Sequence, residues 1–154
     1  MYVQTNLCIF IGTMEIEDSK YCGCLYYSAN ALARIMTKMA EEEFAVTGLA
    51  PSYAFLLMSV NAKAGIQPGE LSAQMQLTPS TVTRLVEKME FKGFVERKSV
   101  GRMTRVYPTN KSKALDAKIK KAWHNLYQRY SDILGPQVDE LTTAVYAAVK
   151  KLGK

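Results

Sequence analysis

The spacing of apolar residues along the chain predicts a mainly helical protein. Residues 19–44 carry apolar side chains at a helical period without an intervening proline, which indicates one long helix. A second, mostly buried helix is expected over 51–61, because Pro51 stands where proline favours the first helical turn. A short helix is expected over 70–76, after a turn marked by Pro68 and the glycine that follows it.

The sharpest local signal is a helix start at Thr78. Threonine is a favoured N-cap, the proline that follows is favoured at the first helical position, and apolar residues then recur at i, i+3, i+4 and i+7, namely Val82, Leu85, Val86 and Met89. Gly93 is placed to cap the end of this helix. Two β-prone runs, 94–97 and 103–107, flank a polar tip at 99–102 and predict a hairpin.

Two further helices are expected near the C-terminal end. The first is capped by Asn110 or Ser112, ends at Gly135-Pro136, and carries an apolar stripe made of Leu115, Ile119, Ala122 with Trp123, Leu126 and Tyr130. The last helix places apolar residues at intervals of three and four, namely Val138, Leu141, Val145, Val149 and Leu152. This heptad-like seam indicates packing against a second chain, and packing on the chain's own first helix is the alternative.

Length and composition favour one domain with a helical arm. A chain of 154 residues with 48% hydrophobic content can bury a sizeable core, and a two-domain enzyme is not expected at this length. No apolar run approaches the roughly 18 residues that a membrane span needs, so we expect a cytoplasmic protein without a membrane partner. The three cysteines, Cys8, Cys22 and Cys24, are odd in number and lack framework spacing, so we expect them to be reduced.

The positive charge is concentrated in one part of the chain. The formal net charge is +6, and residues 84–121 alone carry +8, with twelve Lys or Arg against four acidic residues. Residues 1–60 hold three basic and six acidic residues. A localised basic surface is typical of a nucleic-acid-binding protein, although a solvated, lysine-rich helix surface shows the same pattern.

The sequence carries little that indicates an enzyme. His124 is the only histidine and has no evident catalytic partner, and Cys22-Gly23-Cys24 is a weak zinc signal without further cysteine or histidine nearby. A nucleophile-base pair, a glycine-rich phosphate loop and a metal-ligand cluster are all missing from the pattern. We therefore expect a protein that is not an enzyme and needs no metal or cofactor.

The run from Thr78 to Arg97, TPSTVTRLVEKMEFKGFVER, resembles the recognition helix and first wing strand of the MarR family. The order of expected elements over about 20–152 is similar to that family as well. The resemblance implies a mainly α fold with a small β wing. Its parts would be an N-terminal extension at 1–18, a winged helix-turn-helix DNA-binding domain at 48–110, and a helical dimerisation region formed by 19–47 and 111–154. Two departures are Gln76, where the helix-turn-helix turn usually carries glycine, and the absence of an aspartate beside Arg102 at the wing tip.

The resemblance also implies how DNA would be bound. If the apolar stripe of the recognition helix faces the core, its other faces carry Ser80, Thr81, Thr83, Arg84, Glu87 and Lys88. Arg84 is expected to contact a guanine, while Ser80, Thr81 and Lys88 position the phosphate backbone. Arg102 is expected to enter a minor groove, with Arg97, Lys98 and Arg105 meeting phosphates beside it.

The function implied is that of a regulator, most simply a repressor, which binds double-stranded DNA as a homodimer. A dimer would impose a palindromic operator with half-sites about 34 Å apart. The family resemblance suggests release by a small aromatic ligand or by oxidation. The alternative is a winged-helix interaction module whose basic face meets an acidic protein and has no operator.

The run Tyr21-Cys-Gly-Cys-Leu-Tyr-Tyr-Ser-Ala resembles the start of the first helix in the organic-hydroperoxide-sensing branch of the family. That resemblance implies that Cys22 is the reactive thiol, that Tyr26 stabilises its thiolate, and that Tyr53 closes the pocket. Two alternatives remain open: the cysteines pack a dimer interface, or the tyrosines around Tyr26, Tyr27 and Tyr53 hold a reversible phenolic ligand.

Overall fold

The computed structural model describes residues 19–153, which divide into two units, one ending at Met39 and the other beginning at Ala40. In the first unit a turn over residues 20–23 leads into α1 (Leu25–Phe44). The predicted long helix therefore begins at Leu25 and not at Ser19. The amides of Cys22 and Cys24 each donate to the carbonyl three residues earlier, at 2.9 Å, and Gly23 between them is a poor helix former.

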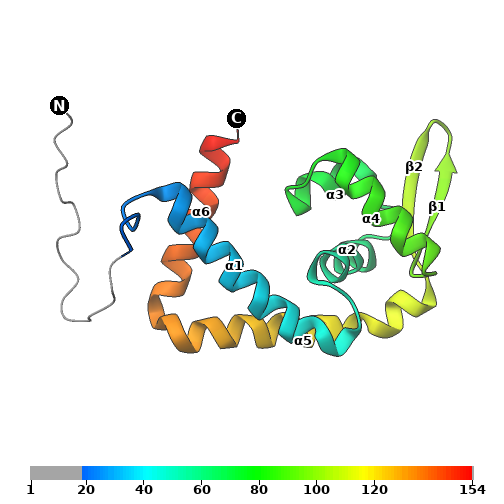
Figure 1. Ribbon diagram of the computed structural model, residues 1–154. Helices are drawn as coiled ribbons and strands as arrows, with labels where there is room; N and C mark the ends of the chain where they lie inside the picture. The colour runs from blue at the N-terminus through cyan, green and yellow to red at the C-terminus, as the bar shows by residue number, and fades with distance from the viewer. Residues whose placement is uncertain (1–18, 154) are drawn as a thin grey trace. The chain divides into compact units, whose positions relative to one another are not determined.

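The second unit contains the winged helix-turn-helix that the sequence predicts. Its elements are α2 (Pro51–Ala62), α3 (Pro68–Met75), α4 (Pro79–Phe91), β1 (Val95–Val100) and β2 (Met103–Pro108) (Figure 1). Each of the three helices begins with proline, which has no amide hydrogen to leave unsatisfied and whose φ is already helical. The expected mainly helical fold with a small β wing is confirmed.

α3 begins earlier than the expected start at Glu70. Gln67 and Glu70 form a capping box, in which the Gln67 amide donates to Glu70 Oε2 at 3.0 Å. This reciprocal capping satisfies the amides at the helix start and extends the helix back to Pro68.

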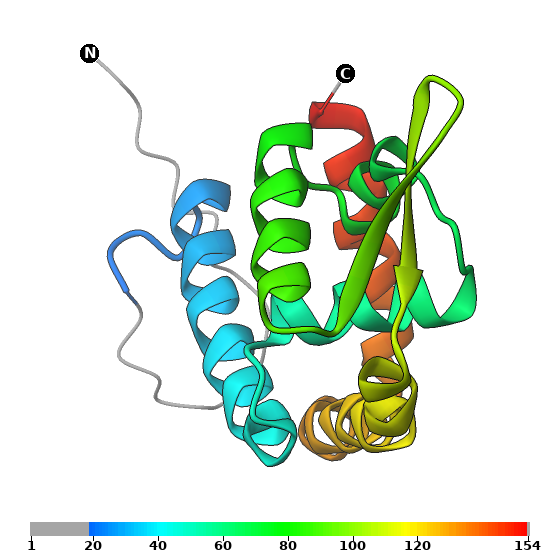
Figure 2. The same ribbon diagram turned by 90° about the vertical axis from the view of Figure 1, so that its right-hand side faces the viewer.

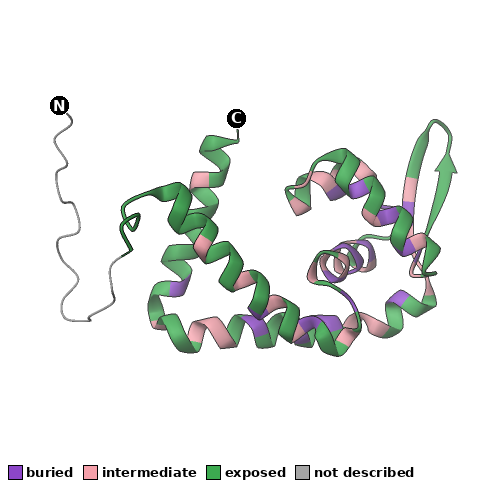
Figure 3. Cartoon of the chain, in the orientation of Figure 1, coloured by how far each residue is buried: buried purple, intermediate pink, exposed green. Residues whose placement is uncertain are grey.

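The core of the winged domain lies where α2 packs against the inner faces of α3, α4 and β2. From α2 it takes Leu56, Leu57 and Val60, and from α4 it takes Val82, Val86 and Met89, all of them buried (Figure 3). Each such side chain contributes about 1.5–3 kcal/mol through the area it removes from water. Three of the four predicted α4 stripe residues are therefore in the core, while Leu85 is half-buried.

Two turns of the winged domain, one after α3 and one after α4, have left-handed backbone. Gln76 adopts φ 52° and ψ 41° at the end of α3, so a non-glycine residue takes a left-handed conformation that glycine adopts most readily. This costs about 1 kcal/mol because of the Cβ contact with the following carbonyl. Gly93 has φ 73°, and the amides of Gly93 and Phe94 donate to the carbonyls of Glu90 and Met89, both at 2.9 Å. This is a Schellman motif, so the predicted glycine cap is confirmed.

The hairpin is longer and its tip tighter than the sequence predicts. Val95 pairs with Pro108 at the base and Val100 with Met103 at the tip. Only Gly101 and Arg102 remain in the loop, with Gly101 at φ 63°, so the expected four-residue tip was wrong. Figure 2 shows the hairpin standing beside α4, the arrangement that defines a wing next to a recognition helix.

α5 (Asn110–Leu134) follows the hairpin and packs against α2. Its N-cap is Thr109, whose hydroxyl accepts from the Ser112 amide at 3.4 Å, and not Asn110 or Ser112 as expected. Ser112 is fully buried instead, and its hydroxyl donates to Asn61 Oδ1 at 2.8 Å. The stripe on α5 buries Ile119, Ala122 and Leu126, while Trp123 is 49% exposed and makes an edge contact with Phe55.

α5 ends at Leu134 with Gly135 as its C-cap, and a short 3₁₀ turn, η2 (Gly135–Gln137), leads into α6 (Val138–Leu152). Figure 3 shows α6 largely in the colour of exposed residues. Val138 is buried, but the rest of the predicted seam is exposed, namely Leu141, Val145, Val149 and Leu152. Within the second unit no described element covers this apolar row.

Within residues 19–153, no group of three or more His, Cys, Asp or Glu side chains is arranged to hold a metal ion. None of the described helices is by itself long and apolar enough to cross a membrane. One bent pair, Leu25–Thr47 with Pro51–Ala62, reaches the required length and composition together, but four residues of α2 lie in the protein core.

Candidate nucleic-acid interface

α4 divides its residues between the core and solvent as a recognition helix requires. Thr78 is its N-cap: the side-chain oxygen accepts from the Thr81 amide at 3.3 Å, which satisfies an amide of the first turn and stabilises the start of the helix. With Val82, Val86 and Met89 buried, the predicted contact residues are all exposed: Ser80, Thr81, Thr83, Arg84 and Lys88. The structure therefore brings these five side chains to the outer faces of one helix.

The hydroxyl groups at the start of α4 are already engaged in local hydrogen bonds. Thr83 Oγ1 donates to the Pro79 carbonyl at 2.9 Å, and the hydroxyls of Ser80 and Thr81 lie 3.1 and 2.8 Å from Thr78 Oγ1. A hydroxyl has a single hydrogen to donate and phosphate oxygens only accept. Thr83 must therefore give up its bond to Pro79 before it can donate to a phosphate.

Arg84 and Lys88 are the cations on α4 best placed to meet a polyanion. Both are exposed and one turn apart, and within residues 19–153 neither forms an ion pair. They border a groove of about 630 Å³ between α2 and α4, whose lining residues are Tyr53, Thr81, Arg84, Leu85, Glu87, Lys88 and Phe91. Their charge is available to an external partner.

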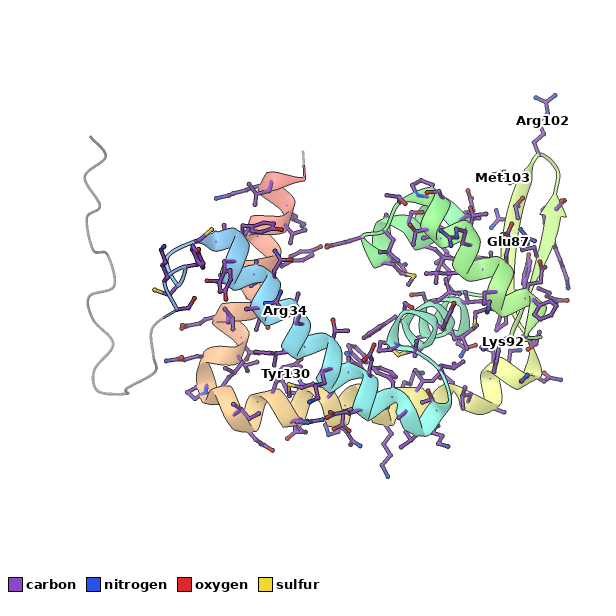
Figure 4. All side chains as sticks on the ribbon, in the orientation of Figure 1. Arg34, Glu87, Lys92, Arg102, Met103 and Tyr130 are labelled. Atoms are coloured by element: carbon purple, nitrogen blue, oxygen red, sulfur yellow. The ribbon has the colours of Figure 1, made fainter. Side chains whose placement is uncertain are left out.

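Arg102 occupies the tip of the wing. It lies in the two-residue loop of the hairpin, is exposed, and extends beyond the end of the strands, as Figure 4 shows. The described residues offer it no carboxylate within ion-pair distance. This agrees with the sequence, which lacks an aspartate beside this arginine.

Arg97 was expected to meet phosphate, but its guanidinium is held by α4. Arg97 Nε and Nη2 lie 2.8 and 2.7 Å from Glu90 Oε2, and Nη1 lies 3.7 Å from a Glu87 oxygen. The hydrogen bond to Glu90 raises the pKa of Arg97 above its ordinary value, and the bond from Arg97 lowers the pKa of Glu90. Both groups are charged at neutral pH, and each largely neutralises the other.

Lys98 and Arg105 are also engaged within the wing. Lys98 Nζ lies 2.8 Å from Glu96 Oε1 and 5.2 Å from the centre of the Tyr107 ring. Arg105 Nη1 donates to the Gly65 carbonyl at 3.0 Å, which ties β2 to the turn before α3. Of the four wing cations that the sequence singled out, Arg102 alone lacks such a contact among the described residues.

The predicted effector residues do not form one site within either unit. Cys22 and Tyr26 belong to the first unit, where Cys22 lies exposed in the turn before α1 and not within the helix. Tyr53 belongs to the second unit and lines the groove beside Arg84. Cys8 and the expected N-terminal extension at 1–18 lie outside the described residues.

Three features of the second unit were missed by the sequence reasoning. Glu90, read as one of a few acidic residues in a basic region, binds Arg97. Phe91 is 89% exposed at the edge of the groove, and its position off the apolar stripe of α4 was the signal for this. A second cavity, of about 520 Å³, lies between α2, α5 and the turn after α3, and Phe55, Met58, Met75, Leu77 and Trp123 line most of its apolar part.

Comparison with known proteins agrees with this geometry. The model of the MarR family matches residues 49–99. Among solved structures, CouR from Rhodococcus jostii RHA1 bound to p-coumaroyl-CoA is 18% identical, with a TM-score of 0.71 over 86% of this chain and 95% of that chain. The M. tuberculosis transcriptional regulator MosR is 21% identical, with a TM-score of 0.72 over 85% of this chain and 98% of that chain. The S. aureus MepR-DNA complex is 16% identical, with a TM-score of 0.71 over 82% and 96%. Comparison with curated proteins finds no match.

Proposed function

Because residues 49–99 match the model of the MarR family, we propose that the chain is a transcription regulator that binds operator DNA in a sequence-specific manner. The observation that carries this proposal is the outer face of α4. Arg84 and Lys88 are exposed there without an ion-pair partner in the described chain, next to a wing whose tip carries Arg102. MepR, which has the same fold, was solved as a DNA complex.

In this proposal α4 enters the major groove and the wing follows the adjacent minor groove. The planar fork of Arg84 can donate two hydrogen bonds to O6 and N7 of one guanine, whereas Lys88 presents a point charge suited to a phosphate. Ser80 and Thr81 lie at the N-terminal, positive end of the helix dipole, where they position the phosphate backbone of the DNA. Arg102 inserts where a narrow minor groove deepens the negative potential.

We further propose a homodimer that binds a palindromic operator as a repressor. The support is the apolar row on α6, which leaves Leu141, Val145 and Val149 each at least 40% exposed. In this proposal residues 48–110 form the DNA-binding domain, and residues 19–47 and 111–154 form the dimerisation region. A single winged module makes few contacts, and pairing two modules on half-sites about 34 Å apart doubles them.

Release by a small aromatic ligand is the form of regulation that the second unit supports. The cavity of about 520 Å³ is within the usual range for small-molecule sites and is lined by aromatic and thioether side chains. CouR, with the same fold, was solved bound to p-coumaroyl-CoA. Trp123 is the only tryptophan in the chain, so its fluorescence reports a ligand at this cavity directly.

Oxidation at Cys22 is the competing form of regulation. Cys22 is exposed, so an organic hydroperoxide can reach its sulfur. Attack of the thiolate on the peroxide oxygen yields a sulfenic acid and releases the corresponding alcohol. The oxidation proposal is supported by the exposure of Cys22 and by the resemblance of residues 21–29 to the organic-hydroperoxide-sensing branch.

The test of the main proposal is a titration of the protein with the promoter DNA next to its own gene at several salt concentrations. An operator binder that neutralises several phosphates gives a steep linear fall of log K with log salt, and unrelated DNA competes only weakly. Equal affinity for promoter and unrelated DNA would refute operator recognition. Absence of DNA binding at low salt would favour a winged-helix module that meets an acidic protein.

A further inference from the structure

Glu90, in the last turn of α4, makes an unusually complete set of contacts with β1. One carboxylate oxygen accepts the backbone amide of Arg97 at 2.9 Å, and the other accepts Arg97 Nε at 2.8 Å and lies 2.7 Å from Nη2. The guanidinium and the backbone amide of Arg97 thus engage different oxygens of the carboxylate, which restricts the orientation of Glu90 as well as its distance from Arg97. Glu90 thus binds both the main chain and the side chain of the same residue.

This contact bridges the place where the wing joins the recognition helix. Between Glu90 and Arg97 the chain turns sharply at Gly93, whose φ of 73° belongs to the left-handed region. On the other side, Thr109 Oγ1 lies 2.8 and 3.0 Å from the carbonyl oxygens of Gly93 and Phe94 and can donate its single hydrogen to either. The angle between α4 and the hairpin is therefore set by a glycine turn held by side chains on both sides.

We propose that Glu90 is a positioning residue for DNA binding, which holds Arg97 and thereby sets the angle at which the wing meets the duplex read by α4. This inference rests on the proposed function. It assigns Arg97 an internal role and leaves the direct contacts to Arg84, Lys88 and Arg102.

The length of the wing makes its angle important. β1 has six residues, so its tip lies about 17 Å from its base at a rise of about 3.3 Å per residue. A rotation of about 10° at the base moves Arg102 by about 3 Å, more than the distance range over which a hydrogen bond survives. A small error at Glu90 is thus amplified at the residue that must reach the minor groove.

The variant Glu90→Ala distinguishes a positioning role from a purely electrostatic one, because the two roles predict opposite changes in operator affinity. Removing an acidic residue near DNA strengthens binding if charge alone matters, and it also frees Arg97 for phosphate. If Glu90 positions the wing, Glu90→Ala weakens operator binding by about fivefold, the upper range for a partly exposed pair of good geometry. Glu96→Ala is the matched control, since Glu96 pairs with Lys98 within β1 and does not link the wing to α4.

Arg97 variants test the other side of the contact. Arg97→Ala and Arg97→Lys should weaken binding equally, because lysine keeps the charge but lacks the fork that Glu90 holds. The double variant Glu90→Ala/Arg97→Ala should bind no more weakly than either single variant. The slope of log K against log salt should stay that of wild type. A slope smaller by about 0.9 in Arg97→Ala would show a direct phosphate contact and overturn the proposal.

Amide hydrogen exchange at Arg97, measured by NMR on the free protein, tests the contact without DNA. Glu90→Ala should accelerate exchange of this amide and leave amides in α2 unchanged, which also shows that the variant is folded. Unchanged exchange, or operator binding by Glu90→Ala as tight as wild type, overturns the inference. If wild type itself binds no operator, the proposed function fails, and the exchange measurement still decides whether Glu90 holds the wing.

Discussion

Ser112→Ala is expected to lower the free energy of unfolding by about 1–2 kcal/mol. The Ser112 side chain is fully buried and donates to Asn61 Oδ1 at 2.8 Å, which joins α5 to α2. The amide of the same Asn61 side chain donates to Asp116 Oδ1 at 3.0 Å, so its orientation is already determined. Without the hydroxyl, Asn61 Oδ1 is left in the helix interface without its donor.

The magnitude follows from the burial of the two partners. An unsatisfied buried acceptor costs about 1–3 kcal/mol, and Asn61 is half-buried, so partial access of water holds the cost to the lower part of this range. For a chain of this length the midpoint of thermal unfolding should fall by about 2–8 °C. In urea the midpoint concentration should fall while the slope m stays the same.

Ser131→Ala is the matched control on the same helix. Ser131 Oγ is buried and has no hydrogen-bond partner among the described residues, so its removal takes away an unpaired polar group and leaves stability equal or higher. Ser112→Ala should therefore lower the free energy of unfolding, whereas Ser131→Ala should leave it unchanged or raise it. Equal effects of Ser112→Ala and Ser131→Ala on the urea midpoint would refute the reasoning.

The remaining predictions concern DNA binding and its control. Arg84→Ala should lower the free energy of operator binding by about 1–3 kcal/mol and relax the preference at one base pair, whereas Lys88→Ala should weaken binding to all sequences. Mobility-shift titrations with single-base variants of the operator measure both effects. Equal, sequence-independent losses for the two variants would exclude a base contact by Arg84. Arg102→Ala should reduce affinity most for operators with A·T-rich flanks, and indifference to the flanks would exclude minor-groove insertion. Val145→Glu, on the exposed row of α6, should convert a dimer to a monomer in sedimentation at micromolar concentration; a monomeric wild type would contradict the dimer. Stoichiometric cumene hydroperoxide should release wild type from DNA, reversibly with thiol, but not Cys22→Ser, and unchanged binding by both proteins would favour the ligand cavity.

The sequence alone determined the features that depend on neighbours a few residues away. The helix starts at Pro51 and Pro79, the cap at Thr78 and the glycine turn at Gly93 follow from φ restrictions and capping hydrogen bonds, which act within one or two turns. The hairpin was visible because β-prone runs and a turn lie together in sequence. The exposed face of α4 followed from helical periodicity alone.

Only the tertiary structure decided which of the predicted contact cations have a partner among the described residues. Arg97, Lys98 and Arg105 look equivalent in sequence, yet Arg97 is held by Glu90 across a turn and Arg105 by the carbonyl of Gly65, forty positions away. The same holds for buried Ser112, whose partner Asn61 lies on another helix. A hydrogen bond of about 3 Å depends on the relative placement of two elements to within a fraction of an ångström, and local patterns carry no such information.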